Sequence, residues 1–383
     1  MTTTISNLPR DLVEEVISRV PATSMRKVRS TCKKWNTLSK DRSFTAKHLA
    51  KAAAASTEKK ESLAIVLMNY SLHLMSVNLH NNNPPLSPEG KLIHQLEVTR
   101  VCHCEGLLLC TTRDYTSLVV WNPYSGQTRW ISVEPAYPTY LAHRLHLYGH
   151  VLGYNEGKRS HKILRFAYAP SNLEQSVQEI YDLSTDSWRV LDDDPDWCLE
   201  YGNYGLSLKG NSYWYAMDKE SRGQGVPDFL LCFDFTNERF APRLPLPFTS
   251  WCPDSVSLSS VRGEQLVVLF QSSDMLDLEI WVTTEIGPEA VSWSKLLTLD
   301  TGGPLRGLEF GSGGGFFVDE EKRAVIVFDE EKHVKTRPTR HVARIFGEVG
   351  YSLREEVDLG EVTKDDGFSL LHACSYVPSA VLF

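Results

Sequence analysis

The 383-residue sequence predicts two unlike parts, a small all-α module at the N-terminus and a large all-β domain behind it. Three observations support this division. Apolar residues follow a helical period near the N-terminus, and from residue 62 onward they follow a period of two. The second part also repeats one strand–turn–strand outline at intervals of roughly 50 residues, which indicates a β-propeller of about six irregular blades. An open stack of β-sandwich layers is the alternative.

The first predicted helix covers residues 11 to 20. On a helical wheel its apolar residues fill one face, and Asp11, Glu14, Glu15, Ser18 and Arg19 fill the other. Pro9 suits the first turn, where its missing N–H costs nothing, and Pro21 ends the helix. The apolar face consists of Leu12, Val13, Val16, Ile17 and Val20.

A second helix is predicted to begin at Thr23 or Ser24, both good N-caps. Its apolar face is formed by Met25, Val28 and Cys32, and Trp35 and Leu38 extend the pattern. A segment of about 35 residues is too short to bury its own apolar faces. This module must therefore pack on something else, either the rest of this chain or another protein.

The module resembles the F-box, the motif by which substrate receptors dock onto the Skp adaptor of a Skp–cullin–F-box ubiquitin ligase. The matching residues are Leu8-Pro9, Asp11-Leu12, Val16-Ile17, Val20-Pro21, Met25, Val28-Arg29 and Cys32-Lys33-x-Trp35. Thr31 stands where the family often has an apolar residue. The resemblance implies that the adaptor is bound by Leu8, Pro9, Leu12, Val16, Ile17, Val20, Pro21, Met25, Val28 and Trp35. A helical cap packed only on its own chain is the alternative.

Three segments follow from these patterns. Residues 1–45 form the F-box module, residues 46–61 form a helical or flexible linker, and residues 62–383 form the propeller. We expect residues 63 to 80 to begin the first blade. We expect the final run, residues 370 to 383, to pair with that blade and close the ring. The repeats, of kelch type in their length, are anchored on Trp121, Tyr181, Phe233, Ile280 and Val327.

The propeller also carries a resemblance, to the plant F-box-associated interaction domain. The residues that carry it are Gly106 to Leu108, Trp121 to Pro123, Tyr181 to Trp188 and Ser375 to Ser379. The resemblance covers nearly all of residues 60 to 383. It implies a domain that recruits the protein to be ubiquitinated. The motif residues themselves look structural, so they do not locate the substrate site.

Sequence motifs of enzymes are not found. The cysteines at 102, 104 and 110 lack the repeated pairs of a zinc site. The acidic run Asp192–Asp196 lacks the pattern of a calcium loop. The glycines between 311 and 315 lack the Lys-Ser/Thr of a phosphate loop, and no G-x-S-x-G elbow occurs. We therefore predict no catalytic residue, no metal and no cofactor.

The predicted function is that of a non-catalytic substrate-recognition subunit of a ubiquitin ligase. Its partners would be a Skp-family adaptor, through it a cullin, and a protein substrate. The alternatives are a propeller hydrolase or oxidase with a helical arm, and a non-degradative scaffold that binds the adaptor. The net charge of −8 argues against non-specific nucleic-acid binding.

The sequence also supports expectations for the location of the protein and for its substrate contacts. The polar N-terminus is unlike a secretion signal, and no apolar run reaches the roughly 20 residues of a membrane span. We therefore expect no membrane contact and a location in the nucleus, the cytoplasm or both.

Aromatic residues in loops are frequent binding hot spots. On that ground the substrate contacts are assigned to Trp197, Tyr201, Tyr204 and Trp251.

Overall fold

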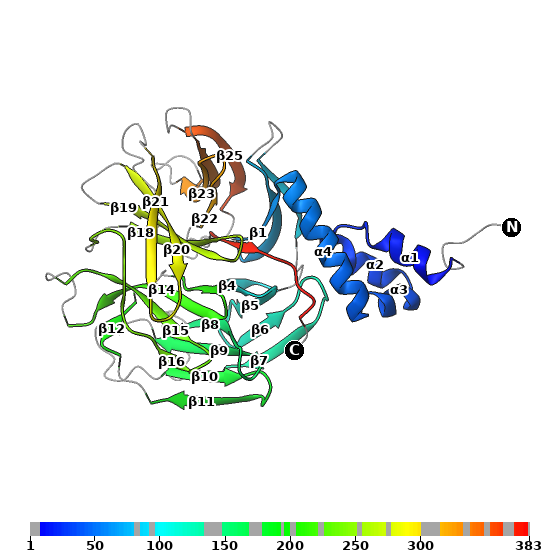
Figure 1. Ribbon diagram of the computed structural model, residues 1–383, viewed down its shortest axis with the longest axis horizontal. Helices are drawn as coiled ribbons and strands as arrows, with labels where there is room; N and C mark the ends of the chain where they lie inside the picture. Colours follow the sequence, from blue (N-terminus) through cyan, green and yellow to red (C-terminus); the bar gives the residue numbers. More distant parts are fainter. Residues whose placement is uncertain are drawn as a thin grey trace.

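A computed structural model shows a helical module that projects from the edge of a ring of six β-sheets (Figure 1). The two-part division and the propeller predicted from the sequence are confirmed. The structure describes residues 8–79, 85–91, 96–133, 148–167, 178–192, 195–199, 204–220, 226–250, 255–272, 277–299, 315–331, 338–347, 353–362 and 371–381.

Short helices build the module, and one longer helix joins it to the propeller. They are α1 (Arg10–Ile17), the 3₁₀ turn η2 (Ala22–Ser24), α2 (Met25–Thr31), α3 (Lys33–Leu38) and α4 (Arg42–Lys59). Asp41 caps α4 by accepting hydrogen bonds from the backbone N–H groups of Ser43 and Phe44. Lys60 ends it in the left-handed conformation. The boundary predicted at residue 45 thus falls inside α4, and most of the predicted linker is helix.

Six blades follow in chain order. The first is completed from the far end of the chain. It contains β1 (Ser62–Met68), β2 (Ser71–Val77), β3 (Leu86–Lys91) and β26 (His372–Tyr376). The second contains β4 (Val98–Cys104), β5 (Leu107–Thr112), β6 (Ser117–Trp121) and β7 (Thr128–Ser132). The third contains β8 (Tyr148–Asn155), β9 (Ser160–Ala167), β10 (Gln178–Asp182) and β11 (Ser187–Leu191).

The fourth blade is the least regular. It contains β12 (Trp197–Cys198), β13 (Leu206–Leu208), β14 (Asn211–Asp218), β15 (Phe229–Asp234), β16 (Arg239–Phe240) and β17 (Leu244–Pro245). The fifth contains β18 (Ser255–Val261), β19 (Gln265–Gln271), β20 (Leu278–Ile286) and β21 (Val291–Leu299). The sixth contains β22 (Phe316–Asp319), β23 (Ala324–Glu331), β24 (Arg340–Phe346) and β25 (Leu353–Glu361).

The ring closes as the sequence predicts. Strand β26 pairs antiparallel with β1, with Leu63 opposite Tyr376 and Leu67 opposite His372.

One of the five residues predicted to occupy equivalent positions in the repeats does not do so. Four of them lie on the third strand of their blades, but Val327 lies on β23, the second strand of the sixth blade. The second and third strands both lie between two neighbours and are both buried, so an apolar run alone does not tell them apart.

The blades pack tightly against each other around the axis. The inner strands of the six blades, β26, β4, β8, β13, β18 and β22, contact one another across it. Gly153 in β8 shows how close the blades come, because a Cβ atom there would lie 2.1 Å from the ring of Phe235 in the fourth blade.

The alternating strand directions give the propeller two faces. We call one the module face, because the turns Glu105–Gly106 and Asn122–Gln127 lie there, next to the helices. We call the other the far face. The turns Asn69–Tyr70 and Arg113–Thr116 lie on it.

Among the described helices, none combines the length and the apolar character that a membrane-spanning helix requires.

Candidate functional site

Helix α1 presents apolar side chains to solvent. Leu12 is 53% exposed and Val16, one turn later, is 52% exposed. Pro9 at the start of the helix is also exposed, and Leu8 is partly buried. Only three other large hydrophobic side chains in the described part of the chain are this exposed, and none of them lies in the module. An apolar pair one turn apart on a helix is a surface ready to be covered by a partner.

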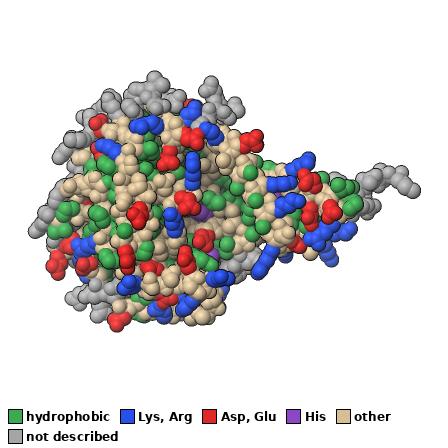
Figure 2. Space-filling view, in the orientation of Figure 1, with side chains coloured by type: hydrophobic (Ala, Val, Ile, Leu, Met, Phe, Trp, Pro, Cys, Tyr) green, Lys and Arg blue, Asp and Glu red, His purple; other side chains and the backbone are tan. Residues whose placement is uncertain are grey.

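Charged side chains border this apolar pair, which we call the α1 patch (Leu12 and Val16). Arg10 donates to Glu14 at 2.7 Å, and Arg19 donates to Glu15 at 2.9 Å. The hydrogen bond from Arg19 lowers the pKa of the Glu15 carboxyl, and so does the nearby Lys51 ammonium. Exposed pairs of this kind add little stability. Figure 2 shows the result, a module on which hydrophobic side chains lie among acidic and basic ones.

The structure divides the predicted adaptor-binding residues into two groups. Ile17, Met25 and Val28 are buried in the module's own core, together with Leu38 and Phe44. These three residues are therefore not available for direct contact, which corrects the prediction for them. Val20 and Trp35 are partly buried against the same core, and Pro21 is exposed. The helical period explains the division, since one apolar arc has an edge that faces inward and an edge that faces solvent.

A residue of the propeller completes the module's core. Tyr124, in the turn between β6 and β7, is 2% exposed and packs among the apolar residues of the helices. Its hydroxyl lies 2.9 Å from Nδ1 of His48, and the other ring nitrogen of His48 lies 2.7 Å from the Val20 carbonyl. Sequence reasoning missed both residues. The Trp-Asn-Pro-Tyr run at 121–124 was the available signal, but a motif does not show what its tyrosine contacts.

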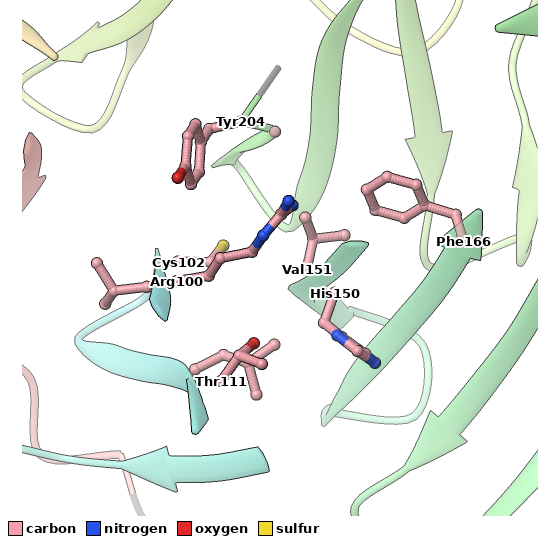
Figure 3. A pocket seen from close by; sticks show the side chains of 10 residues that line it. Arg100, Cys102, Thr111, His150, Val151, Phe166 and Tyr204 are labelled. Carbon is pink, nitrogen blue, oxygen red and sulfur yellow. The ribbon is translucent and has the colours of Figure 1, made fainter. Parts of the chain in front are cut away.

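A small pocket lies at the far-face mouth of the propeller axis. Figure 3 shows its lining, with the Arg100 side chain reaching toward Val151 and Tyr204. The space of about 10 Å³ holds about one water molecule. The ring of Tyr204 stacks on His372 with centroids 4.3 Å apart, and the Arg100 guanidinium lies 5.4 Å from the same ring. The described lining residues include no carboxylate.

Buried histidine also marks this mouth. Both ring nitrogens of His150 are buried without a hydrogen-bond partner. Burial, together with the charges of Arg165 and Arg100, lowers the pKa of His150 to about 3. The imidazole is therefore neutral at physiological pH. It is not suited to act as a general acid, because the imidazolium form that would donate the proton is not populated at that pH.

The predicted substrate contacts are dispersed. Trp197 is buried and packs against Phe240 with centroids 4.7 Å apart, so it is a core residue and the prediction is wrong for it. The sequence around it resembles a loop, but β12 pairs it with Asp218 of β14. Tyr204 lies at the axial mouth, as described above. Tyr201 and Trp251 lie outside the described residues.

The described cysteines lack the features of a reactive thiol. Of the seven described, six are buried and only Cys32 is exposed. Burial raises the pKa of the Cys110 thiol to about 12, and it also raises the pKa of Cys102. A thiol with a raised pKa is a poor nucleophile. Among the described residues, no three His, Cys, Asp or Glu side chains cluster as metal ligands would.

Comparison with known proteins covers both parts of the chain. Residues 5–47 match the F-box domain, and residues 63–383 match the F-box associated β-propeller domain. An F-box/kelch-repeat protein of Arabidopsis thaliana is 49% identical over 98% of this chain and 99% of its own length. A putative F-box protein of the same plant is 46% identical over the whole of both chains.

Proposed function

The chain belongs to the F-box proteins that carry an F-box-associated β-propeller, and from this membership we propose that it recruits a target protein to a Skp–cullin–F-box ubiquitin ligase. An F-box implies binding to a Skp-type adaptor, and the combination with a propeller supports a role in substrate recognition. We propose further that the adaptor links the chain to a cullin, that the complete ligase assembles in this way, and that the recruited protein is ubiquitinated. We also propose that the chain acts in the nucleus, the cytoplasm or both.

The observation that carries the proposal is the α1 patch. Leu12 and Val16 remain exposed although the same helix buries Ile17 completely. Each side chain is already about half buried, so covering the rest would contribute about 1 kcal/mol per side chain to binding. We infer that the adaptor covers the α1 patch, while the buried residues of the module hold α1 in place.

The recruited protein would meet the far face. The helices contact the propeller through Tyr124, Ala380 and Asn78, which lie at the module face, so the opposite face is clear of these contacts. Arginine–aromatic pairs lie at the far-face ends of the strands, including Arg113 over Tyr70 at 4.2 Å and Arg165 over Tyr148 at 4.3 Å. Tyrosine and arginine are the residue types most enriched at binding hot spots.

In this scheme the chain supplies geometry and specificity, and the ligase partner performs the chemistry. Holding a lysine of the recruited protein near the charged ubiquitin carrier raises its effective concentration. The chain itself would need no catalytic group. The raised pKa values of Cys102 and Cys110 and the neutral His150 agree with a non-catalytic role.

Adaptor binding by purified chain tests the proposal. We expect Leu12→Asp/Val16→Asp to reduce the affinity for a Skp-family adaptor by at least about 100-fold, since two apolar contacts are lost and two charges must be desolvated. Val190→Asp is the matched control, because Val190 is 62% exposed on β11 of the propeller, away from the module. Binding that survives in the double variant, or fails in the wild type, would reject the docking role.

A further inference from the structure

The module is joined to the propeller by one covalent connection. Helix α4 ends at Lys59, its C-cap Lys60 adopts a positive φ of 53°, and β1 begins at Ser62. A connection of two residues after a helix end is a natural hinge. The chain path alone would therefore let the helices swing as a body relative to the ring. Beside the hinge, Asn78 donates to the Lys59 carbonyl at 3.1 Å and Lys60 forms an exposed ion pair with Glu321.

A second attachment, far from this hinge in sequence, comes from the second blade. The ring of Tyr124 fills the module's core beside Phe44 and Met25. Arg29 of α2 donates a hydrogen bond to the Tyr124 carbonyl, and its guanidinium lies 5.1 Å from the ring centroid. One side chain is thus held by apolar contact, by a hydrogen bond to its backbone and by a cation–π contact.

His48 links this attachment back to the docking helix. It is 0% exposed, and its pKa is lowered chiefly by burial, so the ring is neutral at physiological pH. Its Nε2–H donates to the carbonyl of Val20, three residues after the end of α1. That leaves Nδ1 to accept the hydrogen bond from the Tyr124 hydroxyl. A continuous chain of contacts therefore runs from the propeller to the segment that follows α1.

The turn that carries Tyr124 is itself fixed to the ring closure. The Asn122 side chain is fully buried and donates to the carbonyls of Ser379 at 3.0 Å and Val381 at 2.8 Å. Its oxygen accepts from the Ser125 N–H at 2.9 Å. Ala380, in the same C-terminal segment, packs against the module's core. The side chain that enters the module is therefore anchored on the C-terminal segment that follows the closing strand β26.

We propose that Tyr124 is a positioning residue, which fixes the orientation of the F-box module on the propeller and so sets the direction in which a recruited protein faces the ligase. The consequence for a recruited protein rests on the function proposed above, but the fixed orientation itself does not. Tyr124 holds the module at a point away from the hinge at Lys60. Without it, the contacts beside the hinge, from Asn78 to Lys59 and from Lys60 to Glu321, would leave the module freer to rotate.

Distances measured between spin labels on the two parts test this proposal. Cys32 is an exposed native thiol on the module. A second label site is Glu156→Cys, in an exposed turn of the third blade on the module face. The six other described cysteines are buried, and Cys252, which lies outside the described residues, is replaced by Cys252→Ser. We expect one narrow distance distribution in the otherwise unchanged chain.

The variants separate orientation from folding. We expect Tyr124→Ala to increase the width of the distance distribution about twofold, as release of a hinge would. The thermal midpoint of the propeller and the binding of the adaptor by the module should not change. Tyr124→Phe retains the ring and should stay narrow. Trp130→Ala is the matched control, since it removes a 60% exposed aromatic residue from the same hairpin. If Tyr124→Ala unfolds the module, Tyr124→Leu keeps apolar volume there and decides the question.

An unchanged, narrow distribution in Tyr124→Ala or, where that variant unfolds, in Tyr124→Leu would overturn the proposal. The measurement requires no adaptor. If the chain fails to bind a Skp-family adaptor but Tyr124→Ala broadens the distance distribution, the positioning role of Tyr124 is supported and the ligase function is rejected. The opposite result, with adaptor bound and no broadening, would keep the ligase function and remove the positioning role of Tyr124.

Discussion

In α1 of the module, Leu12 and Val16 are about half exposed, whereas in β5 of the propeller every residue from Leu107 to Thr112 is buried. Both segments are short and rich in apolar residues. The difference lies in their neighbours. Strand β5 lies between β4 and β6 in a blade that packs against two other blades, while α1 has packing partners on one side only.

This contrast shows how each part obtains its stability. The propeller distributes apolar residues over several large clusters between blades, and its ends meet in one sheet. The module has one small core, and Tyr124 of the propeller belongs to it. A segment of this size cannot bury enough surface alone. The module therefore depends on the propeller at one end and leaves an apolar surface for a partner at the other.

Removing the ring closure should have the largest effect. Deletion of residues 371 to 383 takes away β26, exposes the edge of β1 and removes Ala380 from the module's core. We expect loss of cooperative thermal unfolding and association of the truncated chain through the open edge. Circular dichroism and size-exclusion chromatography measure both.

The control for the deletion is Val377→Ser, in the same C-terminal segment but exposed. It should change the free energy of unfolding by no more than about 0.5 kcal/mol. A truncated chain that stays monomeric and melts within a few degrees of the wild type would show that β26 does not hold the ring together.

The two edges of α1 offer the next comparison. Ile17→Ala should lower the free energy of unfolding of the module by about 3 kcal/mol, because Ile17 is fully buried in its small core. Leu12→Ala should change it by no more than about 0.5 kcal/mol and weaken only adaptor binding. Hydrogen exchange of the helices, measured beside adaptor affinity, separates the two effects.

Equal loss of protection in both α1 variants would contradict the division of α1 into a core edge and a docking edge. So would full adaptor affinity in Leu12→Ala combined with an intact module. Either result would place the docking surface elsewhere on the helices.

Protonation of one buried histidine should give the smallest of the three effects, and acidification should act differently on the two parts. Burial lowers the pKa of His161, in β9 of the propeller, from 6.5 to about 4. The unfolded chain then binds the proton first, so the stability is complete above pH 6.5 and falls as the pH drops to about 4. The loss attributable to His161 is about 3 kcal/mol at most. In the module, the Val20 carbonyl raises the pKa of His48 against the effect of burial, which reduces the corresponding loss.

Urea unfolding at pH 7 and at pH 4.5 measures this prediction. His161→Phe keeps a ring of similar size and cannot be protonated, so the variant should lose less stability than the wild type between the two pH values. His103 and His150 have lowered pKa values of about 4 and about 3, so part of the dependence on pH should persist. Identical losses in wild type and variant would mean that His161 titrates normally in the folded chain.

Several features of the fold were predictable from local sequence. The wheel of α1, the change of period near residue 62 and the return of similar hairpins depend on residues close together in the chain. The closing strand was predictable as well, because a propeller needs a partner for its first blade. Val327 and Trp197 were misplaced because an apolar strand or an aromatic residue near a turn looks the same locally in several positions.

The sequence by itself determined the helical module, the six-bladed ring and the family to which both belong. Only the tertiary structure decided which edge of α1 is buried, that Tyr124 completes the module's core, and that Tyr204 lies beside Arg100 at the axial mouth. The physical reason is the range of the interactions. Helical and strand periods reflect neighbours within a few residues. The contact between His48 and Tyr124 joins residues 76 positions apart, and the local pattern of residues around either one does not indicate it.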